Sequence, residues 1–206
     1  MDDAVMSSIL LASSSATRQR LLKSAGIEFK AISSCVDEAV VRETLAENGE
    51  PTVEPGDLAE ILARAKAEDV SARHPEAVVI GADQVLSCGG EIFTKPASFD
   101  AARDTLLALR GRSHQLHSAV VIAENGETQW AHVDVADLWM RDFSAAFLGR
   151  YLALVGDDAL DSVGAYQIEG PGIQLFERIE GDFFSILGLP LLPLFRELRI
   201  RKVLTE

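Results

Sequence analysis

One stretch near the amino terminus decides the class of fold: Ile9-Leu10-Leu11-Ala12-Ser13-Ser14-Ser15-Ala16-Thr17-Arg18-Gln19-Arg20. Its apolar residues are followed by serines and then by basic side chains, which predicts a strand, a hydroxyl-rich turn and a helix that stops at Gly26. Such a turn offers unpaired backbone N–H groups and the positive end of a helix dipole, which suit a phosphate. An ordinary N-cap with surface arginines gives the same pattern, so other motifs must decide between the two.

Helical and strand-like segments alternate along the remaining sequence, which is typical of an α/β domain. Residues 39–56 indicate a helix fragment followed by a loop, Asp57 is expected to cap the next helix, and residues 85–93 indicate a hairpin about Gly89-Gly90. Strands are expected at residues 29–33, 77–80, 115–123, 130–140 and 173–179, and helices at residues 57–73, 100–109, 143–154 and from residue 189 onward.

Composition narrows the functional class. The chain has 206 residues, 48% of them apolar, which fits one domain over residues 1–206 with a substantial core. A net charge of −13 argues against binding nucleic acid, which requires a basic face. Two distant cysteines, an acidic amino terminus and no long apolar run predict a cytoplasmic protein without disulfides or membrane contact. In so acidic a chain, any phosphate site must consist of a few clustered cations, and we expect a metal with them.

The residues that could act on a phosphate lie in separate segments. Asp83 follows the apolar run 77–80 and is expected just past the carboxyl end of a buried strand, where it could bind a divalent cation or accept a proton from water. Lys66 and Lys95 could meet phosphate, and the pair Asp37-Glu38 could complete a set of carboxylate metal ligands with Asp83. Each has an ordinary alternative: a turn-forming aspartate, a lysine that only covers the surface, or a solvated acid.

His114 and the glycine-rich segment 164–172 give weaker signals. The histidine follows Gly111-Arg112-Ser113 at the start of an expected strand, where a structural role is the commoner one. No Ser–His–Asp order supports a nucleophile. The glycine-rich segment would bring Gln167 and Glu169 close to whatever it wraps, although a plain tight loop would look the same.

In order, these motifs resemble the Maf-like nucleoside triphosphate pyrophosphatases over almost the whole chain. The resemblance is carried by Leu10-Leu11-Ala12-Ser13-Ser14-Ser15, Val36-Asp37-Glu38, Ala65-Lys66-Ala67, Ile80-Gly81-Ala82-Asp83-Gln84-Val85, Lys95-Pro96, Gly111-Arg112-Ser113-His114, Gly164-Ala165-Tyr166, Ile168-Glu169-Gly170 and Gly188-Leu189-Pro190-Leu191. It implies a fold like that of inosine triphosphatases, with a mixed twisted sheet flanked by helices and a nucleotide cleft between two lobes. It also implies hydrolysis of a nucleoside triphosphate to monophosphate and pyrophosphate with Mg²⁺ or Mn²⁺, an acid-anhydride hydrolase reaction in nucleotide metabolism.

The resemblance also implies a role for each matching residue. Asp83 corresponds to the catalytic acid that takes a proton from the attacking water and helps to hold the metal. Glu38 corresponds to a catalytic carboxylate linked to the metal or to the water. The phosphate-binding set corresponds to Ser13, Arg18, Lys66 and Lys95.

Specificity is implied by fewer positions. Gln84 and Glu169 match the branch of the family that favours 7-methyl-GTP, whereas enzymes that favour UTP and dTTP typically carry threonine where Gln84 stands. A carboxylate at residue 169 suits the N–H donors of guanine. The chain departs from the usual Ser-Pro and Arg-Arg or Trp-Arg-Arg pattern at Ala16, Thr17 and Gln19, so the substrate-binding position at Thr17 lacks an aromatic ring.

Three other readings stay open at this point. One is a pyrophosphatase that prefers UTP or dTTP. Another is a nucleotide-binding regulator of cell division or septum formation with little turnover, and the third is a phosphatase that acts on a substrate other than a nucleotide. A homodimer is common for such folds, but no segment of the sequence marks an interface.

Overall fold

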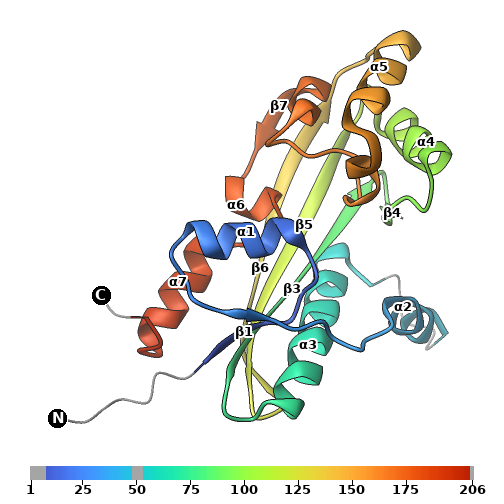
Figure 1. Ribbon diagram of the computed structural model, residues 1–206. Helices are drawn as coiled ribbons and strands as arrows, with labels where there is room; N and C mark the ends of the chain where they lie inside the picture. The colour runs from blue at the N-terminus through green and yellow to red at the C-terminus, as the bar shows by residue number, and fades with distance from the viewer. Residues whose placement is uncertain (1–7, 48–52, 205–206) are drawn as a thin grey trace. The chain divides into compact units, whose positions relative to one another are not determined.

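The computed structural model describes residues 8–47 and 53–204 (Figure 1). Its strands are β1 Ile9–Leu11, β2 Lys30–Ala31, β3 Val78–Cys88, β4 Glu91–Phe93, β5 Ser113–Glu124, β6 Glu127–Met140 and β7 Phe176–Glu180. Its α-helices are α1 Ala16–Ser24, α2 Glu38–Glu47, α3 Pro55–Arg73, α4 Phe99–Leu109, α5 Ala145–Val155, α6 Phe183–Ile186 and α7 Leu191–Ile200. Two 3₁₀-helices, η1 Gly156–Leu160 and η2 Pro171–Leu175, complete the described elements. None of the described helices is long and apolar enough to cross a membrane.

The strands form one mixed sheet of seven strands. Six of them follow the order β2-β1-β3-β5-β6-β7, and β4 pairs with β3 outside that path. β1 pairs in parallel with β2 and β3, whereas the pairs β3–β4 and β6–β7 are antiparallel. The expected mixed α/β sheet flanked by helices is therefore confirmed.

The chain divides into two compact units. The first comprises residues 1–83, 118–134 and 188–206, and the second comprises residues 84–117 and 135–187. Strands β3, β5 and β6 each contribute residues to both units. The nucleotide cleft stays a prediction, as does the assignment of the whole chain to a single domain.

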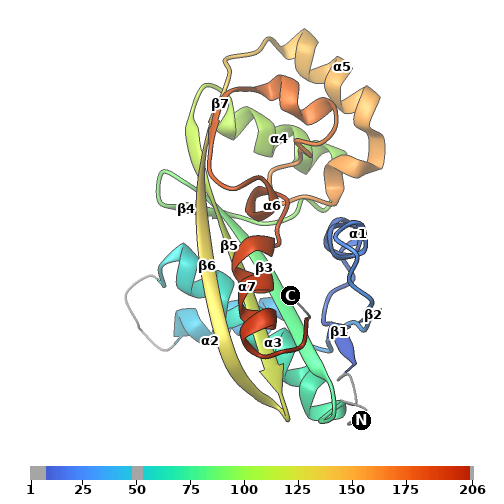
Figure 2. The same cartoon turned by 90° about the vertical axis from the view of Figure 1, so that its left-hand side faces the viewer.

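In the first unit, α3 and α7 cover opposite faces of the strands, as the two views show (Figures 1 and 2). α3 buries its side chains at helical spacing, and the solvent exposure of Ala59, Leu62, Ala63, Ala67 and Val70 is 0%. Full burial of one large aliphatic side chain contributes roughly 1.5–3 kcal/mol to folding. The helix begins at Pro55 with Glu54 in the capping position, so the expected cap by Asp57 is wrong. Proline is favoured at the first position of a helix, where its missing N–H costs nothing, and Asp57 lies in the first turn.

β3 is longer than expected. The sequence predicts that the strand ends at Gly81, but it continues through Asp83 to Cys88. Gly81 marks a close approach between helix and strand instead of a turn. A Cβ atom at residue 81 would lie 2.7 Å from the Cβ atom of Ala67 and would meet the carbonyl oxygen of Ala63. The missing side chain therefore lets α3 lie directly on β3.

We expect Gly81→Ala to lower the free energy of unfolding by about 1–3 kcal/mol, because the added methyl group forces helix and strand apart. Chemical denaturation measures the loss. Gly149→Ala is the matched control, because a Cβ atom at this position of α5 meets nothing within 4 Å. In a helix, that change is expected to stabilise by about 0.5–1 kcal/mol. Equal effects of the two changes would contradict the close packing of α3 on Gly81.

The second unit contains the hairpin and the helices α4 and α5. Gly89 and Gly90 have φ angles of +61° and +86°, which suit a tight turn between β3 and β4 and confirm the expected hairpin. α5 packs against α4 and η1. The strand expected from residue 173 begins at Phe176, because the preceding residues from Pro171 form η2. Proline has a fixed φ and no N–H, so it does not join a ladder of paired strands there.

His114 lies in the core of the second unit and has a structural role, as its place in the sequence suggested. It is 2% exposed, and its Nε2 lies 2.7 Å from the hydroxyl oxygen of Tyr166. Its Nδ1 has no hydrogen-bond partner. Burial lowers the pKa of His114 to about 4 and raises the pKa of Tyr166. The histidine is therefore neutral at pH 7.

This burial predicts a loss of stability in acid. The native protein resists protonation of His114 whereas the unfolded chain does not, so stability is lost as pH falls below 6.5. Between pH 7 and pH 5, the stability advantage of the wild type over His114→Gln is expected to shrink by about 2 kcal/mol. Denaturant midpoints at both pH values measure it, with His74→Gln as the control histidine. A constant difference between wild type and His114→Gln would show that His114 is not held neutral.

Candidate active site

Side-chain hydrogen bonds close the turn between β1 and α1. Ser15 caps the helix, because its Oγ accepts a hydrogen bond from the backbone N–H of Arg18 at 3.4 Å. Ser13 is 8% exposed, and its Oγ accepts from the N–H of Ser15 at 3.2 Å. The side-chain amide of Gln19 donates to the carbonyl oxygen of Ser13 at 3.5 Å. The helix therefore starts at Ala16 with its first turn capped by a serine side chain.

Arg18 is held by backbone carbonyl groups on both sides. Its Nε donates to the oxygen of Gly188 at 2.7 Å, and its Nη1 donates to the oxygen of Ala82 at 2.9 Å. Burial lowers the pKa of Arg18, while the negative charges of Asp83 and Glu38 oppose that shift. A guanidinium group remains charged in proteins, so the result is a fixed cation beside Asp83.

Lys66 joins two carboxylates that are far apart in the sequence. Its Nζ lies 2.5 Å from Oδ1 of Asp83 and 2.6 Å from Oε1 of Glu38. The side chains of Lys66 and Asp83 are 12% and 7% exposed, whereas that of Glu38 is 47% exposed. Of the two orientations that the sequence allowed for Lys66, the structure shows the inward one. Four predicted site residues, Arg18, Lys66, Asp83 and Glu38, therefore form one charged cluster in the first unit.

The environment of Asp83 makes it a better proton acceptor than an exposed aspartate. Burial raises the pKa of Asp83, and the nearby charge of Glu38 adds to the effect. The positive charges of Lys66 and Arg18 act in the opposite direction but do not cancel it. A carboxylate of raised pKa takes up a proton more readily, as a general base must.

Asp83 lies within β3, not past its end as expected. The pairing of β3 with β1 ends at Ile80, and its pairing with β4 begins at Leu86. Between these two points, the carbonyl oxygen of Ala82 accepts the hydrogen bond from Arg18. Because successive side chains of a strand alternate between its faces, Asp83 shares the α3 face with Gly81, and Gln84 points to the opposite face.

Gln84 contacts α6, a short helix that the sequence analysis missed. Its Nε2 donates to the carbonyl oxygens of Ser185 and Ile186 at 3.1 and 3.0 Å. Asp182 caps α6, since its Oδ1 accepts from the N–H of Ser185 at 2.9 Å. The Asp182-Phe183-Phe184-Ser185 sequence is a cap signal that could have revealed the helix. Gln84 is therefore oriented by the protein itself.

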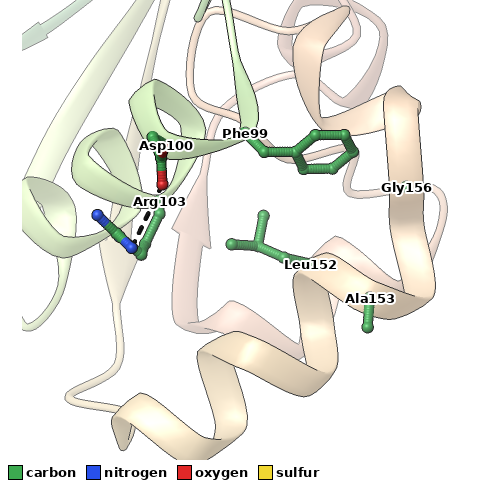
Figure 3. Close-up of a pocket in the computed structure, with 6 residues that line it drawn as sticks. All are labelled: Phe99, Asp100, Arg103, Leu152, Ala153 and Gly156. Atoms are coloured by element: carbon green, nitrogen blue, oxygen red, sulfur yellow. Dashed lines mark ion pairs between the residues drawn. The ribbon is translucent and has the colours of Figure 1, made fainter.

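The remaining predicted site residues are more exposed. Thr17 is half-buried in the first turn of α1, and Lys95 and Glu169 are exposed residues of the second unit. Their substrate contacts stay predictions. A hollow of about 410 Å³ between α4 and α5 is lined by Phe99, Asp100, Arg103, Leu152, Ala153 and Gly156 (Figure 3). It contains none of the predicted site residues.

A metal ion would find an incomplete set of ligands in this cluster. Within the described residues, no group of three or more histidine, cysteine, aspartate or glutamate side chains could hold a metal ion. Asp83 and Glu38 already share one cation, the Lys66 ammonium, so their oxygens face a common point. Mg²⁺ is usually bound by one or two carboxylates with water and substrate phosphates, so the pair fits such an ion but not a site made of protein alone.

The protein is a mixed α/β protein with a seven-stranded sheet. Its cluster of Arg18, Lys66, Asp83 and Glu38 combines cations with carboxylates, which suits chemistry on a phosphate. The sequence pattern of the family described as "Maf-like protein" matches residues 8–201. The chain therefore belongs to the Maf family.

Relatives of known name match over nearly their whole length. A 7-methyl-GTP pyrophosphatase of Brucella abortus is 57% identical, covering 94% of this chain and 96% of the relative. A protein of the same name from Mesorhizobium japonicum is 54% identical, and the match covers 93% of this chain and 94% of the relative. A nucleoside triphosphate pyrophosphatase of Granulibacter bethesdensis is 49% identical, and the match covers 96% of this chain and 98% of the relative. Among solved structures, lipoprotein GNA1162 of Neisseria meningitidis covers 76% of this chain and 99% of its own at 16% identity and a TM-score of 0.29, from which nothing follows.

Burial of the Asp83 carboxylate predicts that Asp83→Asn stabilises the fold. The neutral amide avoids the cost of burying a charge, and Lys66 keeps its ion pair with Glu38. We expect Tm at neutral pH to rise, because burial raises the pKa of Asp83 and so disfavours its charged form in the folded protein. Thermal unfolding checks this.

Asp69→Asn is the matched control with the opposite sign. The backbone N–H of Cys35 and the guanidinium of Arg73 lower the pKa of Asp69, so its charged form stabilises the fold. Tm should fall for Asp69→Asn and rise for Asp83→Asn. A fall for both would contradict the cost assigned to Asp83.

Proposed function

We propose that this protein hydrolyses the α–β phosphoanhydride bond of a nucleoside triphosphate and releases the monophosphate and pyrophosphate. The observation that carries the proposal is the buried Asp83 carboxylate held by Lys66, with Glu38 on the same ammonium and Arg18 beside them. This group joins a base to fixed cations, the two requirements of water attack on a phosphate. The names of the relatives support the same reaction.

In the proposed reaction, Asp83 takes a proton from the water that attacks the α-phosphorus. A bond forms between the water oxygen and the α-phosphorus, the bond to the bridging oxygen breaks, and pyrophosphate leaves with the electron pair. Lys66 orients the Asp83 carboxylate before the reaction and contributes positive charge near the developing negative charge. Glu38 fixes Lys66 from the other side.

The triphosphate is proposed to bind at the turn between β1 and α1. Ser13 and the first turn of α1 provide a hydroxyl group and the positive end of the helix dipole. Arg18 and Lys66 add fixed cations in the first unit. The role of Lys95 in phosphate binding stays a prediction from the sequence. Each charge-assisted contact contributes about 1.5–3 kcal/mol, so loss of one lysine weakens turnover without abolishing it.

Mg²⁺ or Mn²⁺ is part of the proposal. Asp83 and Glu38 would hold the ion, and phosphate oxygens and water would complete its coordination. The ion supplies positive charge that neutralises the phosphates.

The proposed substrate is a modified nucleotide, with 7-methyl-GTP favoured. Two of the relatives described above carry that name, and Gln84 and Glu169 hold the matching positions. A preference for UTP or dTTP would leave the reaction unchanged. The cytoplasmic location and a homodimer stay predictions.

Product analysis across a nucleotide panel with Mg²⁺ or Mn²⁺ tests the proposal. We expect pyrophosphate and monophosphate mainly from 7-methyl-GTP, compared with the four common ribonucleotides and dTTP. Asp83→Asn should lower kcat by about 10²–10⁴-fold or more, because the change removes both the proposed general base and one of the two proposed metal ligands, whereas the cations proposed to bind the phosphates remain and nucleotide is still bound.

Three outcomes would contradict parts of this proposal. Nucleotide binding without pyrophosphate release would favour a regulator with little turnover. Release of orthophosphate from a substrate other than a nucleotide would favour a phosphatase. Unchanged turnover in Asp83→Asn would remove Asp83 from the role of base.

A further inference from the structure

The Glu38 carboxylate belongs to a segment that apolar packing does not hold in place. Glu38 is the first residue of α2, and none of residues 33–45 is buried. The burial of apolar surface therefore does little to fix this part of the chain. The last contact with the sheet before it is made by Ile32, whose N–H donates to the carbonyl oxygen of Leu11 at 2.9 Å. Polar contacts must therefore bring Glu38 to Lys66.

Three side chains on one face of α3 contact residues 33–38. They are spaced by three and four positions, which places them on the same side of the helix: Lys66, Asp69 and Arg73. Their partners in the segment are, in the same order, Glu38, Cys35 and Ser33. The residue numbers of the partners fall as those of the helix rise, so the segment runs along α3 in the opposite direction. The contacts hold it in one register against the helix.

Asp69 is the middle one of these three contacts. Its Oδ2 accepts from the backbone N–H of Cys35 at 2.9 Å and from Nη2 of Arg73 at 2.6 Å. The hydrogen bond from Cys35 and the Arg73 guanidinium lower the pKa of Asp69, so the carboxylate is charged at neutral pH. A hydrogen bond to a charged acceptor is stronger than one between neutral groups. Nη2 of Arg73 also donates to the carbonyl oxygen of Ser33 at 3.4 Å, so the pair contacts the segment at two backbone atoms.

The start of α2 lies directly after this anchored backbone. Oδ1 of Asp37 accepts from the N–H groups of Ala39 and Val40 at 2.9 and 3.4 Å. The carbonyl oxygen of Asp37 accepts from the N–H of Val41 at 3.2 Å. A single residue separates Asp37 from Cys35, so the place where α2 begins depends on where the backbone lies at Cys35.

We propose that Asp69 is a positioning residue of the active site, which places the Glu38 carboxylate on the Lys66 ammonium by holding the backbone at Cys35. The inference rests on the proposed pyrophosphatase function, in which Glu38 fixes Lys66 and would help to hold the metal ion. Asp69 acts through Glu38 and takes no part in the reaction itself.

Asp69→Ala tests the proposal when its effect is compared in wild type and in Glu38→Ala. In wild type, we expect kcat for the preferred nucleotide to fall by about tenfold, because a displaced Glu38 no longer fixes Lys66. In Glu38→Ala, the same change should lower kcat by less than about twofold, since the group that Asp69 positions is already absent. A role of Asp69 in folding alone would lower kcat by the same factor on both backgrounds.

Glu60→Ala is the matched control on the same helix. Glu60 forms the same kind of ion pair, with Arg64 at 2.6 Å, and its side chain is 31% exposed compared with 27% for Asp69. Its kcat should stay within about twofold of wild type, because an exposed pair of this kind contributes little. Asp69→Asn keeps an oxygen that can accept from Cys35 and should therefore retain more activity than Asp69→Ala. Equal losses of kcat on the two backgrounds, or an equal loss in Glu60→Ala, would overturn the proposal.

Amide hydrogen exchange gives a readout that does not depend on the proposed reaction. In Asp69→Ala, exchange at Cys35 and Val41 should be faster by about tenfold, whereas Glu60→Ala should leave both unchanged. If the wild type releases no pyrophosphate from any nucleotide but exchange responds in this way, the reaction is wrong and Asp69 still places the start of α2. Unchanged exchange at Val41 in Asp69→Ala would overturn the positioning role, whatever the activity.

Discussion

The close packing of α3 on β3 is the constraint on which the charged cluster depends. Gly81 lacks a side chain where α3 crosses the strand, and two residues further along β3 Asp83 meets Lys66 of the same helix. A larger residue at position 81 would push the helix outward and lengthen that ion pair. The short distance between Lys66 and Asp83 is therefore set by backbone packing and not by the ion pair alone.

The charged cluster buries an ionisable carboxylate, which is unfavourable for folding but useful for the proposed reaction. Burial of Asp83 opposes its ionisation, and two cations on nearby elements only partly compensate. Stability alone would favour a neutral side chain there, since burial raises the pKa of Asp83 and so disfavours its charged form. A charged carboxylate that is buried at such a cost fits the proton transfer proposed for Asp83. Arg18 holds the backbone next to Asp83 through its hydrogen bonds to the carbonyl oxygens of Ala82 and Gly188.

Several elements of the fold and the site could be predicted from local patterns in the sequence. The strand, turn and helix at residues 9–24, the hairpin about Gly89-Gly90 and the apolar stripe of α3 agree with expectation, because each depends on neighbours in the sequence. The prediction that Asp83 lies past the end of its strand was wrong. In the sequence, Gly81 indicates a turn, because the packing of α3 against it is not visible there. α6 was missed because four residues form too short a period to detect.

The sequence by itself determined the class of fold, the acidic balance and the set of acids and lysines that carry the resemblance to the Maf family. The tertiary structure decided how those residues meet: Lys66 with Asp83 and Glu38, Arg18 with two backbone carbonyl groups, and Gln84 with α6. Local periodicity reports which face of an element is buried, but not which distant residue lies opposite it. These contacts join residues 17 to 170 positions apart, so only packing brings them together.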